Sequence, residues 1–224
     1  MDYQELKNFG QLYTPKASAR VMMASLMSIP KELGFIGTPK FVAGLQGKDR
    51  HWKKRKFKAA IERKITHREF IEGNQYSLAF YTAMIQACGR EKTMKAYPKL
   101  AHKLGVMMWE DFMPASEDFQ RCPDPWEALR QYFLEFFRTN EREGVMRFEI
   151  IADSDSEFQV HLSDCAWWSM NQEAGYPEVI EITSQCDLMF FPKLLQEMGG
   201  DFRRDGWICH GDSFCDWHFL RHGV

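Results

Sequence analysis

The stretch "VMRFEIIADSDSEFQVHLSDC", residues 145–165, decides the fold class of this chain. Apolar and polar residues alternate on both sides of "DSDS" (153–156), and alternation around turn-forming residues is typical of a β-hairpin. The residues before this stretch have the composition and periodicity of helices. Strands that follow a run of helices predict an α+β fold with an antiparallel sheet.

The chain up to about residue 140 is predicted to be mainly helical. Helices are expected over residues 15–34, 52–65, 75–89, 91–112 and 125–144. The first of these starts at Pro15 and is broken at Pro30, and the helix over 91–112 is broken around Pro98 and Gly105. Gly89 suits a helix end and Pro125 suits a first helical turn, because glycine tolerates a left-handed C-terminal conformation and proline needs no N–H donor there.

The second part, about residues 141–224, is expected in the order ββααββ. Its elements are the first hairpin, a helix that opens at Ser163 or Asp164 and closes at Gly175, a helix over 177–191 ended by Pro192, and a second hairpin or meander within 200–220. We interpret residues 1–224 as a single α+β domain.

Composition narrows the classes of partner. The net charge is −2, so no overall field attracts nucleic acid. The basic run from His51 to Lys64 is interpreted as the solvated face of a helix whose apolar side carries Trp52 and Phe57. The aromatic share of 14% indicates a thick core or an apolar pocket. We expect a small-molecule ligand, and the sequence leaves a homo-oligomer open.

Neither a membrane span nor an export signal is expected. No segment approaches the ~20 apolar residues that cross a bilayer, and "MDYQELKNFG" at the start has no apolar core of a signal peptide. These features predict a cytoplasmic, reducing location. The six cysteines should then be thiols, ligands or nucleophiles rather than disulfides.

The segment "ICHGDSFCDWHF", residues 208–219, contains two cysteines, two histidines and two aspartates. In an extended strand Cys215 and Trp217 share one face, whereas Asp216 and His218 share the other. A loop of odd length around Asp212 would place Cys209 opposite Cys215. The segment lacks the paired C-x₂-C spacing of structural zinc sites, so it does not predict a metal site by itself.

Two further cysteines have chemically suggestive surroundings. Cys186 lies on an apolar helical stripe, and the sequence leaves open whether it is a core thiol or projects into a pocket. Cys165 precedes a helix, whose N-terminus favours a thiolate and could make this cysteine a nucleophile. Cys88 and Cys122 have no such surroundings and are interpreted as structural.

Three segments together resemble the L-2-amino-thiazoline-4-carboxylic acid hydrolase family. They are "HLSDCAWW" (161–168), "TSQCD" (183–187) and "HGDSFCDWHF" (210–219), and the resemblance covers about residues 125–220. It implies hydrolytic opening of a small cyclic amidine carboxylate to a carbamoyl-cysteine, without a cofactor. Such an enzyme would be a hydrolase acting on a carbon–nitrogen bond other than a peptide bond.

The resemblance also implies roles for particular residues. Attack on an amidine carbon needs a nucleophile and a proton donor. The catalytic candidates are Cys186 or Cys215 as nucleophile, with Cys165 as a further thiol, His161 or His218 as acid–base group, and Asp164, Asp187 or Asp216 as orienting carboxylates. The substrate-binding candidates are Arg203 or Arg204, either of which could hold a carboxylate, and Trp167 and Trp217. The alternative for the arginines is solvated charge on a hairpin.

Two other classes of protein fit the same residues. One is a small-molecule-binding or sensory module resembling vinyl-reductase-type domains, in which the late cysteines bind zinc or line a pocket. The other is a scaffold in which the cysteines are ordinary core residues. Metal content and the reactivity of individual thiols would distinguish the classes. The most useful single observation is which of Cys165, Cys186, Cys209 and Cys215 converge on one solvent-reachable cavity.

Overall fold

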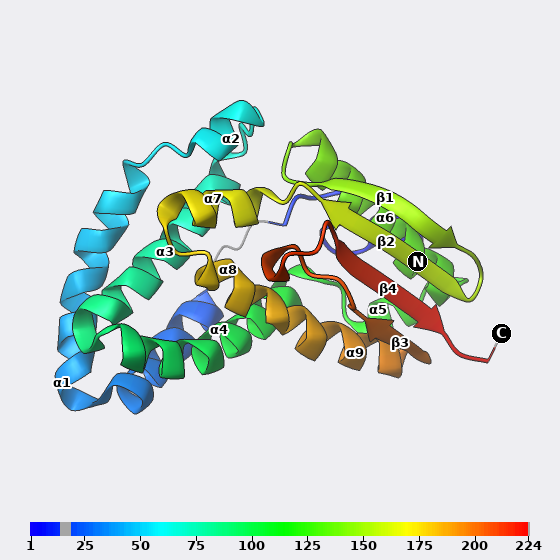
Figure 1. Ribbon diagram of the computed structural model, residues 1–224. Helices are drawn as coiled ribbons and strands as arrows, with labels where there is room; N and C mark the ends of the chain where they lie inside the picture. The colour runs from blue at the N-terminus through cyan, green and yellow to red at the C-terminus, as the bar shows by residue number, and fades with distance from the viewer. Residues whose placement is uncertain (14–18, 224) are drawn as a thin grey trace.

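The computed structural model of the chain describes residues 1–13 and 19–223, and the helix start expected at Pro15 lies outside them. It confirms the predicted α+β fold: a helical first part precedes a four-stranded antiparallel sheet (Figure 1). The strands are β1 (Arg147–Asp153), β2 (Glu157–Ser163), β3 (Gly200–Arg203) and β4 (Cys215–Arg221), arranged in the order β1-β2-β4-β3.

The helices of the described residues follow the chain in this order: η1 (Tyr3–Glu5), α1 (Ala19–Lys53), α2 (Lys58–Glu62), α3 (Arg68–Cys88), α4 (Arg90–Phe112), α5 (Ser116–Gln120), α6 (Pro125–Arg142), α7 (Ala166–Ala174), α8 (Glu178–Thr183), η2 (Ser184–Cys186), α9 (Asp187–Glu197) and η3 (Ile208–His210), where η marks a 3₁₀ turn. As expected, Pro125 opens α6, and Asp124 caps it by accepting from the backbone N–H groups of Trp126 and Glu127.

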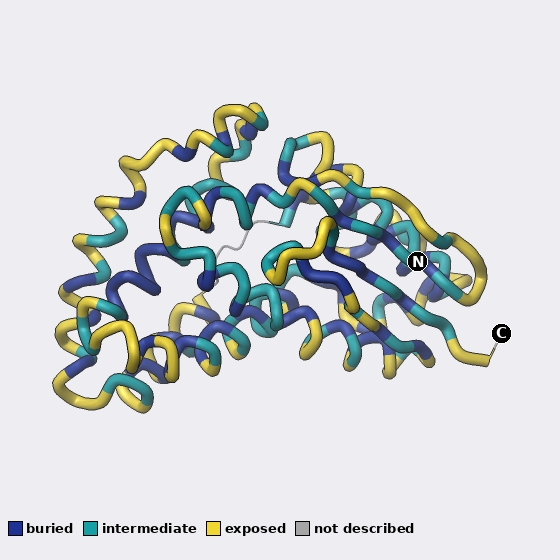
Figure 2. Tube along the Cα trace, viewed as in Figure 1, coloured by how far each residue is buried: buried dark blue, intermediate teal, exposed yellow. Residues whose placement is uncertain are grey.

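Helices α1, α3 and α4 lie on one side of the molecule and the sheet on the other (Figure 1). Helices α7 and α8 lie between the two parts, and α6 covers one face of the sheet. One cluster of buried apolar residues, from Leu6 to Phe219, runs through both parts. The dark segments of Figure 2 follow this cluster along α3, α4 and the inner strands.

Aromatic side chains fill the layer between α6, α9 and the sheet. Phe133 of α6 lies 4.5 Å from Phe219 of β4, and Phe191 of α9 lies 5.0 Å from Trp217, measured between ring centroids. Because side chains alternate along a strand, Trp217 and Phe219 of β4 face this layer, and so does Cys215. The high aromatic content thus supplies a thick core on one face of the sheet.

Three helix breaks expected at prolines are wrong. Pro30, Pro98 and Pro192 lie inside α1, α4 and α9. Proline removes one backbone hydrogen bond, but packing of the neighbouring apolar side chains, such as the fully buried Phe191, outweighs that loss. Helix α1 instead kinks at Gly34, where φ is +70°, a conformation that favours glycine.

Two other expected elements differ in detail. The basic run does not form one helix, because α1 ends at Lys53 and α2 begins only at Lys58. Cys209 lies in the 3₁₀ turn η3 rather than in a strand opposite Cys215, and β4 pairs instead with β2 and the short β3. Because Cys209 lies in a turn, the register of the strands could not predict its position.

Candidate active site

The four late cysteines converge on one cavity. Cys165, Cys186, Cys209 and Cys215 all line a space of about 200 Å³ between the helical part and the sheet. Its walls are mainly apolar and include Trp109 of α4. Sites for drug-sized ligands usually measure ~300–1,000 Å³, so this cavity suits a small molecule.

A buried ion pair lies at the cavity. Arg204 Nη1 donates to Asp187 Oδ2 at 2.5 Å, and the exposed fractions of the two side chains are 5% and 8%. Asp187 Oδ1 accepts from Trp109 Nε1 at 2.9 Å, and Arg204 also donates to the Ser184 carbonyl at 3.2 Å. Burial raises the pKa of Asp187, and the Arg204 guanidinium opposes that shift. The pair therefore holds the guanidinium in a fixed position.

Two N–H donors next to this pair lack acceptors. Arg204 Nε and Trp217 Nε1 are buried, and neither has a hydrogen-bond partner among the described residues. Both side chains line the cavity, and the Arg204 guanidinium carbon lies 3.7 Å from the centre of the Trp207 ring. A buried donor without a partner costs about 1–3 kcal/mol, which a ligand acceptor would remove.

Cys215 lies beside the same arginine. Although burial lowers the pKa of Arg204, the Asp187 carboxylate and the Cys215 thiol raise it overall. Cys215 Sγ also accepts from the backbone N–H of Ile208 at 3.4 Å. Cys215 therefore has both a cation and a backbone N–H donor beside its sulfur.

Burial raises the pKa values of the Cys165, Cys186 and Cys209 thiols. Burial raises the pKa of Cys165 to about 11, against the lowering effect of the Trp168 and Trp167 backbone N–H groups, and burial raises that of Cys209 to about 11. Burial and the adjacent Asp187 raise the pKa of Cys186 well above its ordinary value. The lowering expected at the start of α7 therefore exists for Cys165, but desolvation exceeds it.

Cys186 is confined by its neighbours. Its Sγ lies 3.7 Å from Asp187 Oδ1 as a donor, although adjacent helical residues normally point about 100° apart. The 3₁₀ turn η2 ends at Cys186 and α9 begins at Asp187. A Cβ atom placed on Gly105 of α4 would lie only 2.7 Å from this sulfur. The thiol therefore fills the space that Gly105 leaves.

The predicted acid–base histidines lie on the other face of the sheet. His161 of β2 stacks on Phe214, with ring centres 3.6 Å apart, and its Nε2 lies 3.7 Å from Asp216 Oδ1. His218 Nε2 lies 2.7 Å from Glu157 Oε1. Neither histidine nor Asp216 lines the cavity, because each alternates with an inward residue such as Cys215 or Trp217. The structure does not bring them to the late cysteines.

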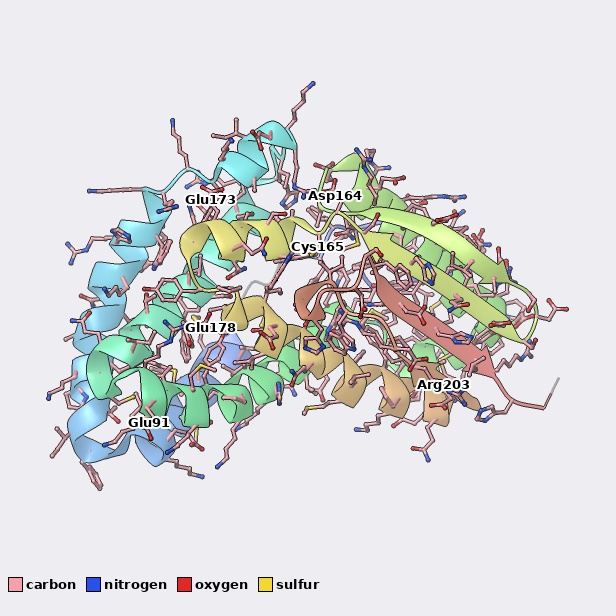
Figure 3. All side chains as sticks on the ribbon, viewed as in Figure 1. Glu91, Asp164, Cys165, Glu173, Glu178 and Arg203 are labelled. Carbon is pink, nitrogen blue, oxygen red and sulfur yellow. The ribbon has the colours of Figure 1, made fainter. Side chains whose placement is uncertain are left out.

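The remaining candidates divide between cavity and surface. Cys165 lies at the junction of β2 and α7, whereas Arg203 projects from the edge near β3 (Figure 3). Arg203 is 60% exposed, with its Nε 3.7 Å from Asp201 Oδ2. Asp164 does not line the cavity, and its Oδ1 lies 2.5 Å from Arg63 Nη2. Trp167 lines the cavity and contacts Phe70 at 4.7 Å between ring centroids.

The family model for L-2-amino-thiazoline-4-carboxylic acid hydrolase matches residues 49–219. The chain belongs to this family. The match includes all four cavity cysteines, Asp187 and Arg204, and it also covers α3 and α4, for which sequence analysis found no motif. Searches of curated proteins and of solved structures gave no match.

Some of the residues that line the cavity could not be recognised as site residues from the sequence alone. Trp109, which binds Asp187, is 78 residues away from it in the chain. Asn74 and Asn171 lie on α3 and α7 and touch only in the folded protein. Isolated polar residues within helices do not indicate a site, so only the tertiary structure could identify them.

Neither a metal-ligand cluster nor a membrane-spanning helix is found in the described part of the chain. Residues 1–13 and 19–223 contain no group of three or more His, Cys, Asp or Glu side chains that could hold a metal ion. Within the same ranges, none of the helices combines the length and apolar character that crossing a membrane requires.

Proposed function

We propose that this protein hydrolyses a small cyclic amidine carboxylate of the 2-amino-thiazoline-4-carboxylate type. Family membership supports the reaction class, and the cavity supports the size of the substrate. The observation that carries the proposal is the group of buried donors at Arg204 Nε and Trp217 Nε1 beside Cys215. A planar carboxylate could accept from both donors, since guanidinium N–H groups match carboxylate oxygens.

Cys215 is the proposed nucleophile. Arg204 acts on all four cavity thiols, but Cys215 also shares a hydrogen bond with it and accepts from the Ile208 N–H. Cys186, by contrast, is packed against Gly105 and bonded to Asp187. A carboxylate held by Arg204 would place the ring next to the Cys215 sulfur. Positioning of this kind lowers the barrier because the reacting atoms are already aligned.

The proposed reaction consumes one water. The Cys215 sulfur adds to C2 of the ring, and the thiol proton passes to the ring nitrogen. The bond between C2 and this nitrogen then breaks, a proton from the exocyclic amino group moves to the departing nitrogen, and a thioimidate remains on Cys215. Water adds to the carbon of this intermediate and gives one proton to its imine nitrogen and the other to the Cys215 sulfur. The Cys215 sulfur then leaves, which gives S-carbamoyl-cysteine.

The test is an assay of ring opening with L-2-amino-thiazoline-4-carboxylate, in which carbamoyl-cysteine is measured by mass spectrometry. Cys215→Ser should lower kcat roughly a thousandfold or more, as loss of a nucleophile does. Cys88→Ser is the matched control, because Cys88 does not line the cavity, and its activity should match that of the native protein. Turnover by Cys215→Ser at the native rate would overturn the assignment of the nucleophile.

The carboxylate contact is tested separately. Arg204→Lys keeps a cation opposite Asp187 but removes the Nε donor, so it should raise KM more than it lowers kcat. Arg203→Lys changes an exposed arginine and should leave both constants unchanged. Binding of the substrate without turnover by the native protein would instead favour the binding-module class.

A further inference from the structure

Asn74 of α3 and Asn171 of α7 form a polar pair in a mainly apolar part of the cavity. Their exposed fractions are 3% and 0%, and both residues line the cavity. Asn171 Nδ2 donates to Asn74 Oδ1 at 2.8 Å and to the Trp167 carbonyl at 2.8 Å. The pair thus joins two helices and uses one amide nitrogen for both contacts.

These contacts fix which atoms remain unpaired. The Trp167 carbonyl can only accept, so the atom of Asn171 that faces it must be the amide nitrogen. The atom of Asn74 that faces this nitrogen must then be the oxygen. One donor, Asn74 Nδ2, and one acceptor, Asn171 Oδ1, are left without a hydrogen-bond partner among the described residues.

An unpaired donor and an unpaired acceptor at this depth are costly. Each costs about 1–3 kcal/mol, and helix packing alone would be better served by apolar side chains at both positions. Arg204 and Trp217 of the cavity also carry an unpaired buried donor, but Asn171 Oδ1 adds an unpaired buried acceptor, and Ser77 has neither. Ser77, one turn further along α3, also lines the cavity, but its hydroxyl donates to the Gly73 carbonyl at 3.1 Å.

We infer that Asn74 and Asn171 form a recognition subsite for a ligand group in which an N–H donor lies beside a nitrogen or oxygen acceptor. Amidines, ureas and carboxamides have such an edge. In a neutral 2-amino-thiazoline the amino group and the unprotonated ring nitrogen form it, so the ligand amino group would donate to Asn171 Oδ1 and the ring nitrogen would accept from Asn74 Nδ2. The identity of the ligand rests on the proposed function, whereas the existence of the subsite does not.

Calorimetry with two ligands tests the inference, in the Cys215→Ala background so that turnover does not interfere. L-2-amino-thiazoline-4-carboxylate has the amidine edge, and thiophene-3-carboxylate has a similar ring and carboxylate without it. The first should bind about tenfold more tightly, the equivalent of one hydrogen bond worth about 1.4 kcal/mol. Asn74→Asp keeps the acceptor for Asn171 Nδ2 but removes the free donor, and it should abolish this preference while leaving thiophene-3-carboxylate binding unchanged.

Ser77→Ala is the matched control on the same helix and should change neither affinity. Equal weakening of both ligands by Asn74→Asp, or an unchanged preference, would overturn the subsite. If the native chain binds no thiazoline, the proposed function fails. The subsite is then tested by itself, by titrating urea into the native protein. A saturable shift of the Asn74 side-chain NH₂ resonances in ¹⁵N NMR spectra of the native protein would support it, and the absence of a shift would overturn it. This NMR titration uses the native protein, so it does not depend on the folding of a variant.

Discussion

Arg204 and Asp187, 17 residues apart in the chain, form a buried ion pair in which Nη1 of the arginine lies 2.5 Å from Oδ2 of the aspartate. The pair leaves Arg204 Nε free of partners among the described residues and keeps the guanidinium beside Cys215. Buried ion pairs contribute little net stability but fix geometry strongly. The pair therefore serves the site by positioning the arginine.

Removing the aspartate charge should destabilise the fold. In Asp187→Asn the buried Arg204 cation loses its counter-ion, which typically costs about 3–5 kcal/mol of unfolding free energy. Urea denaturation followed by circular dichroism measures the change. Asp201→Asn is the control, because the Asp201–Arg203 pair is exposed and should contribute less than about 1 kcal/mol. Equal effects of the two substitutions would contradict the role given to burial.

Gly105 should tolerate no side chain. In Gly105→Ala the new Cβ would lie 2.7 Å from Cys186 Sγ and from its Cβ, and overpacking of this kind costs about 1–3 kcal/mol. Gly47→Ala is the control in helix α1, since no heavy atom beyond its chain neighbours and the nearby backbone of its own helix lies within 4 Å of the new Cβ. That substitution should stabilise the protein by up to about 1 kcal/mol through helix propensity. Thermal unfolding of both variants checks the opposite signs, and a stabilised Gly105→Ala would refute the close contact.

The thiols with raised pKa values should alkylate slowly at neutral pH. A free thiol has a pKa near 8.5, so at pH 8 a thiol with a pKa of about 11 contains roughly two-hundredfold less thiolate. We expect iodoacetamide to modify Cys165 and Cys209 at rates that rise about tenfold per pH unit from pH 8 to pH 10, because the thiolate fraction increases until the pH reaches the pKa. Peptide mass spectrometry follows each cysteine, with glutathione as reference. Rates that level off between pH 9 and pH 10 would show that these thiols ionise normally.

The outer-face histidines should be dispensable for ring opening. A general acid or base contributes about 10²–10⁴-fold to the rate, and we expect His161→Asn and His218→Asn to lower kcat/KM far less than this because neither side chain lines the cavity. Steady-state kinetics at pH 7 and pH 8 measure both variants, with circular dichroism to verify folding. Loss of activity in a folded variant would support the prediction that a histidine carries the proton.

Several features of the fold follow from short segments of the sequence. The alternation in residues 145–165 predicts β1 and β2, and Pro125 and Gly89 mark real helix boundaries, because these signals act over one or two turns of chain. The helix breaks predicted at Pro30, Pro98 and Pro192 are wrong because the effect of proline on a helix competes with apolar packing against distant segments. Local conformational preferences therefore predicted helices and strands correctly wherever tertiary packing did not oppose them.

In the candidate site, too, some features follow from the sequence and others only from the tertiary structure. The sequence by itself identified the cysteines, Asp187 and Arg204 as chemically capable groups, and it placed Cys215 and His218 on opposite faces of a strand, since side-chain direction alternates locally. Only the tertiary structure decided that Cys215 faces the cavity with Arg204 and that His218 faces away. It also supplied Trp109, Asn74 and Asn171 from distant helices. Burial and pairing depend on which segments pack together, and those two quantities set the pKa values and leave donors free for a ligand.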